Sequence, residues 1–143
     1  MGEVIVKVRI VNLRDMLFFE DGQIEKKEIR SLEVNALVDT GAVMLVLPQD
    51  EVAYLGLKER RKVTVRYADD RTEERFVAGP LFLEIPGDWG ERNMSTDCIV
   101  GPPASEALIG QIVLEELDLM VDCVENRLKP RPESPHRPLL KLK

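Results

Sequence analysis

The sequence has few of the residues on which most hydrolases and metalloenzymes depend. It contains one histidine, His136, and two cysteines, Cys98 and Cys123, among 143 residues. A catalytic triad needs an imidazole held in a fixed position, and His136 lies between Pro135 and Pro138, outside any regular pattern. Zinc sites need three or four ligands at short spacings, whereas the two cysteines are far apart in the chain. We therefore expect no metal ion, no other cofactor and no histidine-dependent nucleophile.

Two further absences concern partners and location. No apolar run approaches the roughly 20 residues that span a bilayer, and the start Met1-Gly2-Glu3-Val4 does not resemble a secretory signal. Acidic residues outnumber basic ones by 26 to 20, a net charge of −6 that disfavours nonspecific nucleic-acid binding. We expect a cytoplasmic protein without membrane or nucleic-acid partners. In that compartment Cys98 and Cys123 would be buried and reduced, although their spacing alone does not exclude a disulfide bond between them.

The sequence does contain many segments in which apolar residues alternate with polar ones, the pattern of half-buried strands. One run, Val43–Leu47, is continuously apolar and is interpreted as a strand buried on both sides that ends at Pro48. The alternating segments, together with shorter apolar runs, predict strands at Val4–Ile10, Leu32–Val38, Val63–Tyr67, Phe76–Ile85, Thr96–Val100 and Leu119–Val124. Polar residues 69–72 would form the tip of a long hairpin, and Asp21-Gly22 an exposed loop at 20–28.

Helical spacing is confined to two short stretches. Apolar residues from Ile109 to Leu117 recur every three or four positions, which predicts one late amphipathic helix. A shorter helix is predicted at 49–55, ended by Gly56. The fold class is therefore all-β, a closed or sandwiched barrel with one short C-terminal helix. Residues 1–128 form one domain, in which Met16, Phe18 and Phe19 are expected in the core. Residues 129–143, rich in proline and basic side chains, form a flexible tail.

The segment with chemical potential is Ala36-Leu37-Val38-Asp39-Thr40-Gly41-Ala42. It places an ionisable Asp39 directly after a buried strand, and apolar neighbours on both sides would partly desolvate the carboxylate. Gly41 lacks a Cβ, so its main-chain N–H can approach a carboxylate oxygen closely. A carboxylate in this position often only caps a turn. That interpretation stays open on these residues alone.

Asp39-Thr40-Gly41-Ala42 resembles the active-site signature of aspartic proteases, and most closely the single-domain retropepsin-like branch. A second block, Ile99-Val100-Gly101 followed by Leu108-Ile109-Gly110 and the helix, is similar to the C-terminal third of those proteases. The resemblance implies that Leu108, Ile109 and Gly110 pack beside the active-site loop. The hairpin at 63–77 falls where the family has its flap over the substrate. The resulting flap candidates are Tyr67, Ala68, Asp69, Asp70 and Arg71.

The mechanism implied by the resemblance needs two aspartates. One acts as general base on a water molecule, while the other, protonated, acts as general acid. This chain holds only one Asp-Thr-Gly and no Asp-Ser-Gly. The resemblance therefore implies a two-fold homodimer in which the Asp39 residues of the two copies lie together at the axis. Thr40, Gly41 and Ala42 would support the active-site loop. Thr40 would brace the two loops across the axis.

Three interpretations follow for function. The first is an aspartic endopeptidase acting on a peptide or protein substrate, with Asp39 as the catalytic residue. The second is a catalytically inactive module with the same fold and dimer, used for binding or as a scaffold. The third is a monomer in which Asp39 only caps a turn. The intact Asp39-Thr40-Gly41 sequence favours the first, because a decayed site would be free to lose any of the three.

Overall fold

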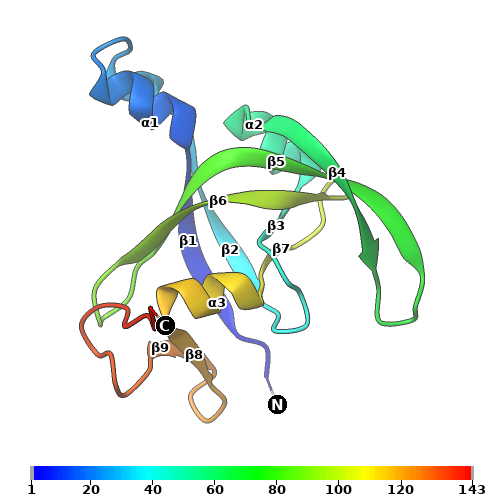
Figure 1. Cartoon of the computed structure of the whole chain (residues 1–143), viewed down its shortest axis with the longest axis vertical. Helices are drawn as coiled ribbons and strands as arrows, with labels where there is room; N and C mark the ends of the chain where they lie inside the picture. The colour runs from blue at the N-terminus through cyan, green and yellow to red at the C-terminus, as the bar shows by residue number, and fades with distance from the viewer. Residues whose placement is uncertain (1, 143) are drawn as a thin grey trace.

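Six strands of the computed structural model, which describes residues 2–142, pair edge to edge until the sheet closes on itself (Figure 1). The first and last of these strands are joined by antiparallel pairs such as Ile10 with Leu83. In order around the barrel the strands are β1 (Ile5–Asn12), β2 (Ser31–Val38), β7 (Ala107–Ile109), β3 (Val46–Pro48), β6 (Arg92–Gly101) and β5 (Thr72–Ile85). A seventh strand, β4 (Lys58–Arg66), pairs only with β5 and forms with it a hairpin that extends beyond the barrel. The all-β closed barrel predicted from the sequence is confirmed.

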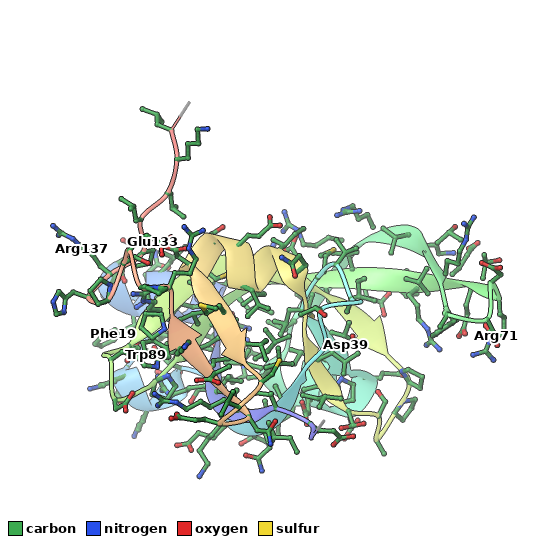
Figure 2. The ribbon with its side chains drawn as sticks, turned by 90° about the horizontal axis from the view of Figure 1, so that it is seen from below. Phe19, Asp39, Arg71, Trp89, Glu133 and Arg137 are labelled. Atoms are coloured by element: carbon green, nitrogen blue, oxygen red, sulfur yellow. The ribbon has the colours of Figure 1, made fainter. Side chains whose placement is uncertain are left out.

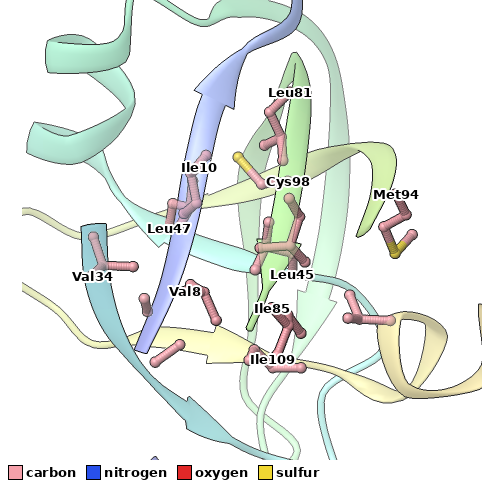
Figure 3. Packing of buried hydrophobic residues seen from close by; sticks show 14 of the residues in the cluster. Val8, Ile10, Val34, Leu45, Leu47, Leu81, Ile85, Met94, Cys98 and Ile109 are labelled. Carbon is pink, nitrogen blue, oxygen red and sulfur yellow. The ribbon is translucent and has the colours of Figure 1, made fainter. Parts of the chain in front are cut away.

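The core fills the inside of this barrel. Alternation along β1 buries Val8 and Ile10 while Lys7 and Arg9 face solvent, as their spacing predicts. Each strand contributes in the same way, so the interior is lined by branched aliphatic side chains. Figure 3 shows Val8, Ile10, Val34, Leu45, Leu47, Leu81, Ile85, Met94, Cys98 and Ile109 in this cluster. Packing of this kind fixes strand register, because a one-residue shift would move the apolar face to the outside.

The remaining elements are short. They are the helices α1 (Leu13–Glu20), α2 (Gln49–Leu55) and α3 (Gln111–Leu117), the 3-10 helix η1 (Lys26–Glu28), and a separate hairpin of β8 (Leu119–Asp122) and β9 (Arg127–Pro130). The predicted helix at 49–55 is confirmed, and Gly56 ends it in the left-handed conformation that favours glycine. Among residues 2–142 no helix has the length and apolar character that a membrane crossing requires.

The late helix predicted from the sequence is present as α3, but α1, which precedes η1 between β1 and β2, was not predicted. Asn12 caps α1, its side chain accepting a hydrogen bond from the main-chain nitrogen of Asp15 at 3.1 Å. The assignment of Phe18 and Phe19 to the core was also wrong. They are 45% and 39% exposed, and Met16 is half-buried. The helix extends away from the barrel, so only one side of it has protein to pack against (Figure 1).

Two further boundaries differ from the prediction. The apolar run Val43–Leu47 does not form one buried strand, because β3 begins at Val46 and Val43 is 63% exposed. Ile109 belongs to β7, so α3 begins two residues later than its apolar spacing suggested. In both places the chain departs from its regular pattern in order to form the loop around Asp39 described below.

The C-terminal segment starts within a strand. Lys129 and Pro130, assigned from the sequence to the tail, are the last residues of β9 and pair with β8. Beyond them, the main-chain N–H of Leu139 donates to Oδ2 of Asp118 at 3.0 Å. The guanidinium of buried Arg92 donates to the carbonyl oxygen of Ser134. These contacts attach much of the segment to the body of the protein.

Candidate active site

Asp39 is the first residue after β2 and begins a tight turn. The main-chain nitrogen of Gly41 donates to Oδ1 of Asp39 at 2.9 Å, and that of Ala42 donates to the carbonyl oxygen of Asp39 at 3.0 Å. Asp39 is half-buried, whereas Thr40 and Gly41 are exposed. The turn thus holds the carboxylate in a defined orientation while leaving access to it from solvent.

The neighbouring elements hold this turn by its main chain. The nitrogen of Asp39 donates to the carbonyl oxygen of Ile109 at 2.9 Å, which extends the parallel pairing of β2 with β7. At the start of α3, the nitrogen of Gln111 donates to the carbonyl oxygen of Ala42 at 2.8 Å, and that of Ile112 donates to Val43 at 2.9 Å. Free N–H groups of a helix N-terminus are satisfied in this way. The loop is therefore fixed from two sides.

Gly110 lies between β7 and α3, directly against the Asp39 loop. A Cβ at this position would lie 2.5 Å from the carbonyl oxygen of Met44 and 2.7 Å from that of Ala42. No larger residue fits without moving the backbone of the loop. Leu108, Ile109 and Gly110, singled out from the sequence, are thus brought beside Asp39-Thr40-Gly41-Ala42. Ile109 contributes its carbonyl oxygen and Gly110 its lack of a side chain.

An apolar strip crosses the outside of the barrel next to this loop. Leu108 pairs with Val46, Val46 with Ile99, and Ile99 with Val77, so the four side chains share one face of the sheet. This face points away from the core. The next residues along the same strands point into the core, and they are Ile109, Leu47, Cys98 and Ala78. We call Leu108, Val46, Ile99 and Val77 the outer strip. Three of its members, all except Val77, are only half-buried, so the strip offers apolar surface beside Asp39.

The hairpin of β4 and β5 is closed by the predicted tip. The nitrogen of Tyr67 donates to the carbonyl oxygen of Arg71 at 2.8 Å, and Asp70 adopts a positive φ of 65°. The guanidinium of Arg71 lies over the ring of Tyr67, 4.6 Å from its centroid. Ala68 and Asp69 are exposed. Figure 2 shows Arg71 at the far end of the hairpin, apart from Asp39, so this structure does not bring the flap candidates to the loop.

A family model described as aspartyl protease matches residues 26–113, more than half of the chain. The chain belongs to the aspartyl protease family. The matched region of this family member runs from η1 into α3 and includes the Asp39 loop, the outer strip and the hairpin.

Solved structures show the fold of this aspartyl protease family member. An EIAV protease complexed with the inhibitor HBY-793 is 19% identical in sequence, with a TM-score of 0.52, and the match covers 80% of this chain and 88% of that one. A retropepsin-like aspartic protease from Rickettsia conorii is 18% identical, with a TM-score of 0.38 and coverage of 85% and 94%. None of the curated proteins matches the sequence. The match to the EIAV protease, the one with the higher TM-score, shows a retropepsin-like fold, as the resemblance implied.

The structure also reveals features of this aspartyl protease family member that the sequence did not indicate. A groove of about 810 Å³ lies between α3, β8 and the C-terminal segment. Its lining includes Thr40, Leu114, Met120, Leu139 and Leu140. The groove therefore begins at the exposed residue next to Asp39. Its walls come from segments that are distant in sequence, and only their contact in the fold assembles it.

The two cysteines differ in environment. Cys98 lies in the core, where burial raises the pKa of its thiol to about 12. Cys123 is exposed in the turn between β8 and β9, so the expectation that both are buried was wrong for Cys123. The two thiols are free, and no bridge joins them. Within residues 2–142, no group of three or more His, Cys, Asp or Glu side chains is placed to hold a metal ion.

Proposed function

We propose that the protein is an aspartic endopeptidase whose active site forms when two copies bring their Asp39 carboxylates together. In each copy Asp39 lies on a turn fixed by Gly41, β7 and α3. One carboxylate would act as general base on a water molecule, and the other would donate a proton to the substrate carbonyl. Two carboxylates so close cannot both be ionised, so the pair shares one proton. The chemistry requires no metal ion or other cofactor.

The observation that carries this proposal is the accessible but fixed carboxylate of Asp39. A carboxylate that merely capped a turn would need only its bond to Gly41. Here three main-chain hydrogen bonds also join the surrounding loop to residues outside it, namely Ile109, Gln111 and Ile112. The exposed position of Thr40 leaves room for a second copy to approach. We also propose a cytoplasmic location, with which the two free thiols agree.

The other candidate is a catalytically inactive dimer of the same fold that binds or organises other proteins. The exposed apolar side chains Val43 and Ile112 beside the loop favour a protein contact at this surface, whichever activity is present. The two candidates differ in what Asp39 does. In the inactive module its carboxylate would have no role beyond the turn.

The deciding experiment is peptide cleavage by the full chain and by its Asp39→Asn variant. The amide oxygen of asparagine can still accept the hydrogen bond from Gly41, so the turn is expected to persist while the shared proton is lost. General acid–base groups typically contribute 10²- to 10⁴-fold, and we expect a loss of about 1,000-fold or more in kcat/KM. Circular dichroism should show an unchanged fold.

Asp88→Asn is the matched control. Asp88 is an exposed carboxylate that pairs with Arg127 at 3.3 Å on the surface, and its replacement should leave cleavage unchanged. If wild-type protein cleaves no member of a broad peptide library, the inactive module is the correct interpretation. If the Asp39→Asn variant cleaves as fast as wild type, Asp39 is not the catalytic residue.

A further inference from the structure

The hairpin presents two different faces, and one of them continues the outer strip. Val77 belongs to the strip, and because side chains alternate along a strand, Arg75 and Glu73 lie on the same side of β5. Their partners across the hairpin are Val63 for Arg75 and Val65 for Glu73. Register therefore places these side chains on the surface that begins beside Asp39. The structure reveals this connection through pairings that the sequence alone does not provide.

Accessibility supports the same division. In the outer part of the hairpin, from Lys62 to Arg66 and from Thr72 to Phe76, half-buried residues alternate with exposed ones. Val63, Val65, Glu73 and Arg75 are half-buried. The opposite face carries the exposed side chains Lys62, Thr64, Arg66, Glu74 and Phe76. The half-buried face is thus mostly apolar, with an arginine–glutamate pair placed in it.

Arg75 is incompletely paired on this face. Its Nη2 donates to Glu73, while its Nε is shielded from solvent and has no hydrogen-bond partner among residues 2–142. A shielded donor without an acceptor is costly, so a change of rotamer that turns the Arg75 guanidinium outward to a ligand carboxylate would remove that cost. Arg61, which pairs with Val77, adds a second guanidinium on the same face. Among the hairpin residues of this face, two arginines against one glutamate give a net positive charge.

We infer that Arg75, aided by Arg61, binds an acidic side chain of the peptide substrate, so that the protein selects peptides with Asp or Glu near an apolar cleavage site. A carboxylate supplies the acceptors that the guanidinium lacks, and such charge-assisted bonds are among the stronger ones in proteins. The outer strip accounts for the apolar part of the preference. The inference rests on the proposed function for the identity of the ligand as a peptide substrate.

Glu73 has a defined place in this arrangement. It neutralises Arg75 in the free protein and competes with an incoming carboxylate for the same guanidinium. Removing its charge should therefore strengthen the selection of acidic peptides. Removing the charge of Arg75 should abolish that selection. The two variants are expected to act in opposite directions, which a general loss of hairpin structure would not produce.

The test uses peptides that share an apolar central pair and carry Glu, Gln or Lys at one flanking position at a time. Binding is measured by fluorescence anisotropy on the Asp39→Asn form of the full chain, which does not need turnover, and cleavage is measured on the Asp39 form. At one position at least, we expect Glu to be preferred over Gln by about 10-fold or more. The ratio should fall to about one in Arg75→Gln and rise in Glu73→Gln.

Arg66→Gln is the matched control, because it removes the same charge from the opposite face of the same hairpin. It should leave the Glu-to-Gln ratio unchanged. Arg75→Lys keeps the charge and should keep part of the preference. Equal effects of Arg75→Gln and Arg66→Gln, or wild-type binding without an acidic preference at any position, would overturn the inference.

The two readouts separate the two proposals. Acidic preference in binding that depends on Arg75, without cleavage by the Asp39 form, would reject the protease and support the Arg75 site as a peptide-binding site. Cleavage without that preference would support the protease and reject the role of Arg75. Since the wild-type peptide series decides the preference by itself, an unfolded variant does not leave the question open.

Discussion

Gly110 and Met44 approach each other so closely that the structure has no space for a side chain between them. A Cβ on Gly110 would lie 2.5 Å from the carbonyl oxygen and 2.8 Å from the nitrogen of Met44. Both contacts are with backbone, which cannot move aside as a flexible side chain can. The position of the Asp39 loop therefore depends on a glycine about 70 residues later in the chain.

Gly110→Ala should displace the loop and reduce cleavage. We expect a loss of about 1–3 kcal/mol in the free energy of unfolding, the usual cost of inserting a methyl group into a packed site. Because the methyl group presses on the main chain of the loop, activity should fall further than stability accounts for at a temperature where the variant is folded. Urea unfolding and kcat measure the two effects. Gln111→Ala, at the exposed neighbouring position, should change neither by much.

Mixing of subunits tests whether two copies share one site. When wild-type and Asp39→Asn chains are combined in equal amounts and allowed to exchange, about one quarter of the dimers contain two wild-type subunits. Activity should therefore fall to about one quarter of that of the same total amount of wild-type protein. A value of about one half would mean that each chain acts alone. Sedimentation equilibrium on the same samples should show the dimer.

The thiols should differ sharply in reactivity. Cys123 is exposed and should react with a thiol reagent in the native protein, whereas Cys98 should react only after unfolding. Titration with Ellman's reagent should thus give one thiol per native chain and two in denaturant. Two fast thiols in the native state would contradict the burial of Cys98.

Cys98 also predicts a loss of stability at alkaline pH. Its folded pKa is raised from 9.0 to about 12, so above pH 9 the unfolded chain releases a proton that the folded chain retains. The free energy of unfolding should then decrease with rising pH between 9 and 12, by at most about 1.4 kcal/mol per pH unit from this group. Cys98→Ala lacks the titration. Urea unfolding of both proteins across this range should show that the difference in free energy of unfolding between wild type and Cys98→Ala decreases as the pH rises.

Asp118 predicts the opposite dependence at acid pH. The hydroxyl of Ser134, then the main-chain N–H of Leu139, lower the pKa of this carboxyl, and nearby Arg131 adds to the effect. A lowered folded pKa stabilises the fold above the usual value of about 4, and this contribution is lost as pH falls through the folded pKa. The stability difference between wild type and Asp118→Asn should therefore be largest near neutral pH and vanish in acid.

The backbone conformation makes asparagine a suitable replacement there. Asp118 has a positive φ of 55°, which asparagine tolerates well, so the substitution mainly removes charge. Because the charged carboxylate also pairs with Arg131 at 3.3 Å, which a neutral amide does not replace, the variant should also speed proteolysis of the C-terminal segment. Asp88→Asn serves again as the exposed control. An unchanged pH profile in Asp118→Asn would show that Asp118 does not anchor the segment.

Much of the fold was predictable because one face of many strands is exposed to solvent and the other is buried. Exposed and buried residues alternate from Lys7 to Ile10 in β1 and from Glu33 to Ala36 in β2. α2 lies between Pro48 and Gly56, two residues with strong local preferences. α1 was missed because its apolar residues Leu17, Phe18 and Phe19 are consecutive and so lack the spacing of an amphipathic helix. All three are exposed in the structure. The capping residue Asn12 was the available signal.

For the candidate site, the sequence indicated which residues to consider but not what surrounds them. Asp39 and the Leu108-Ile109-Gly110 block could be identified because each has a distinctive local sequence. The outer strip and the place of Arg75 depend on pairings between strands far apart in the chain. Such pairings follow from the barrel as a whole, and no local pattern specifies them. Val43 was misplaced for the same reason, since hydrogen bonding to α3 turns the chain there before β3 begins.

Closure of the barrel divides β5 into two parts with different freedom. Its second half is paired on both edges from Leu81 to Glu84, with β1 and with β6. Its first half, Thr72–Phe76, is paired only with β4, and the register shift between Ala78 and Leu81 separates the two halves. Amide hydrogens of the first half should thus exchange through local opening, while those of the second exchange only when the barrel unfolds. A single strand would then combine the most persistent part of the molecule with a segment able to swing aside for a ligand.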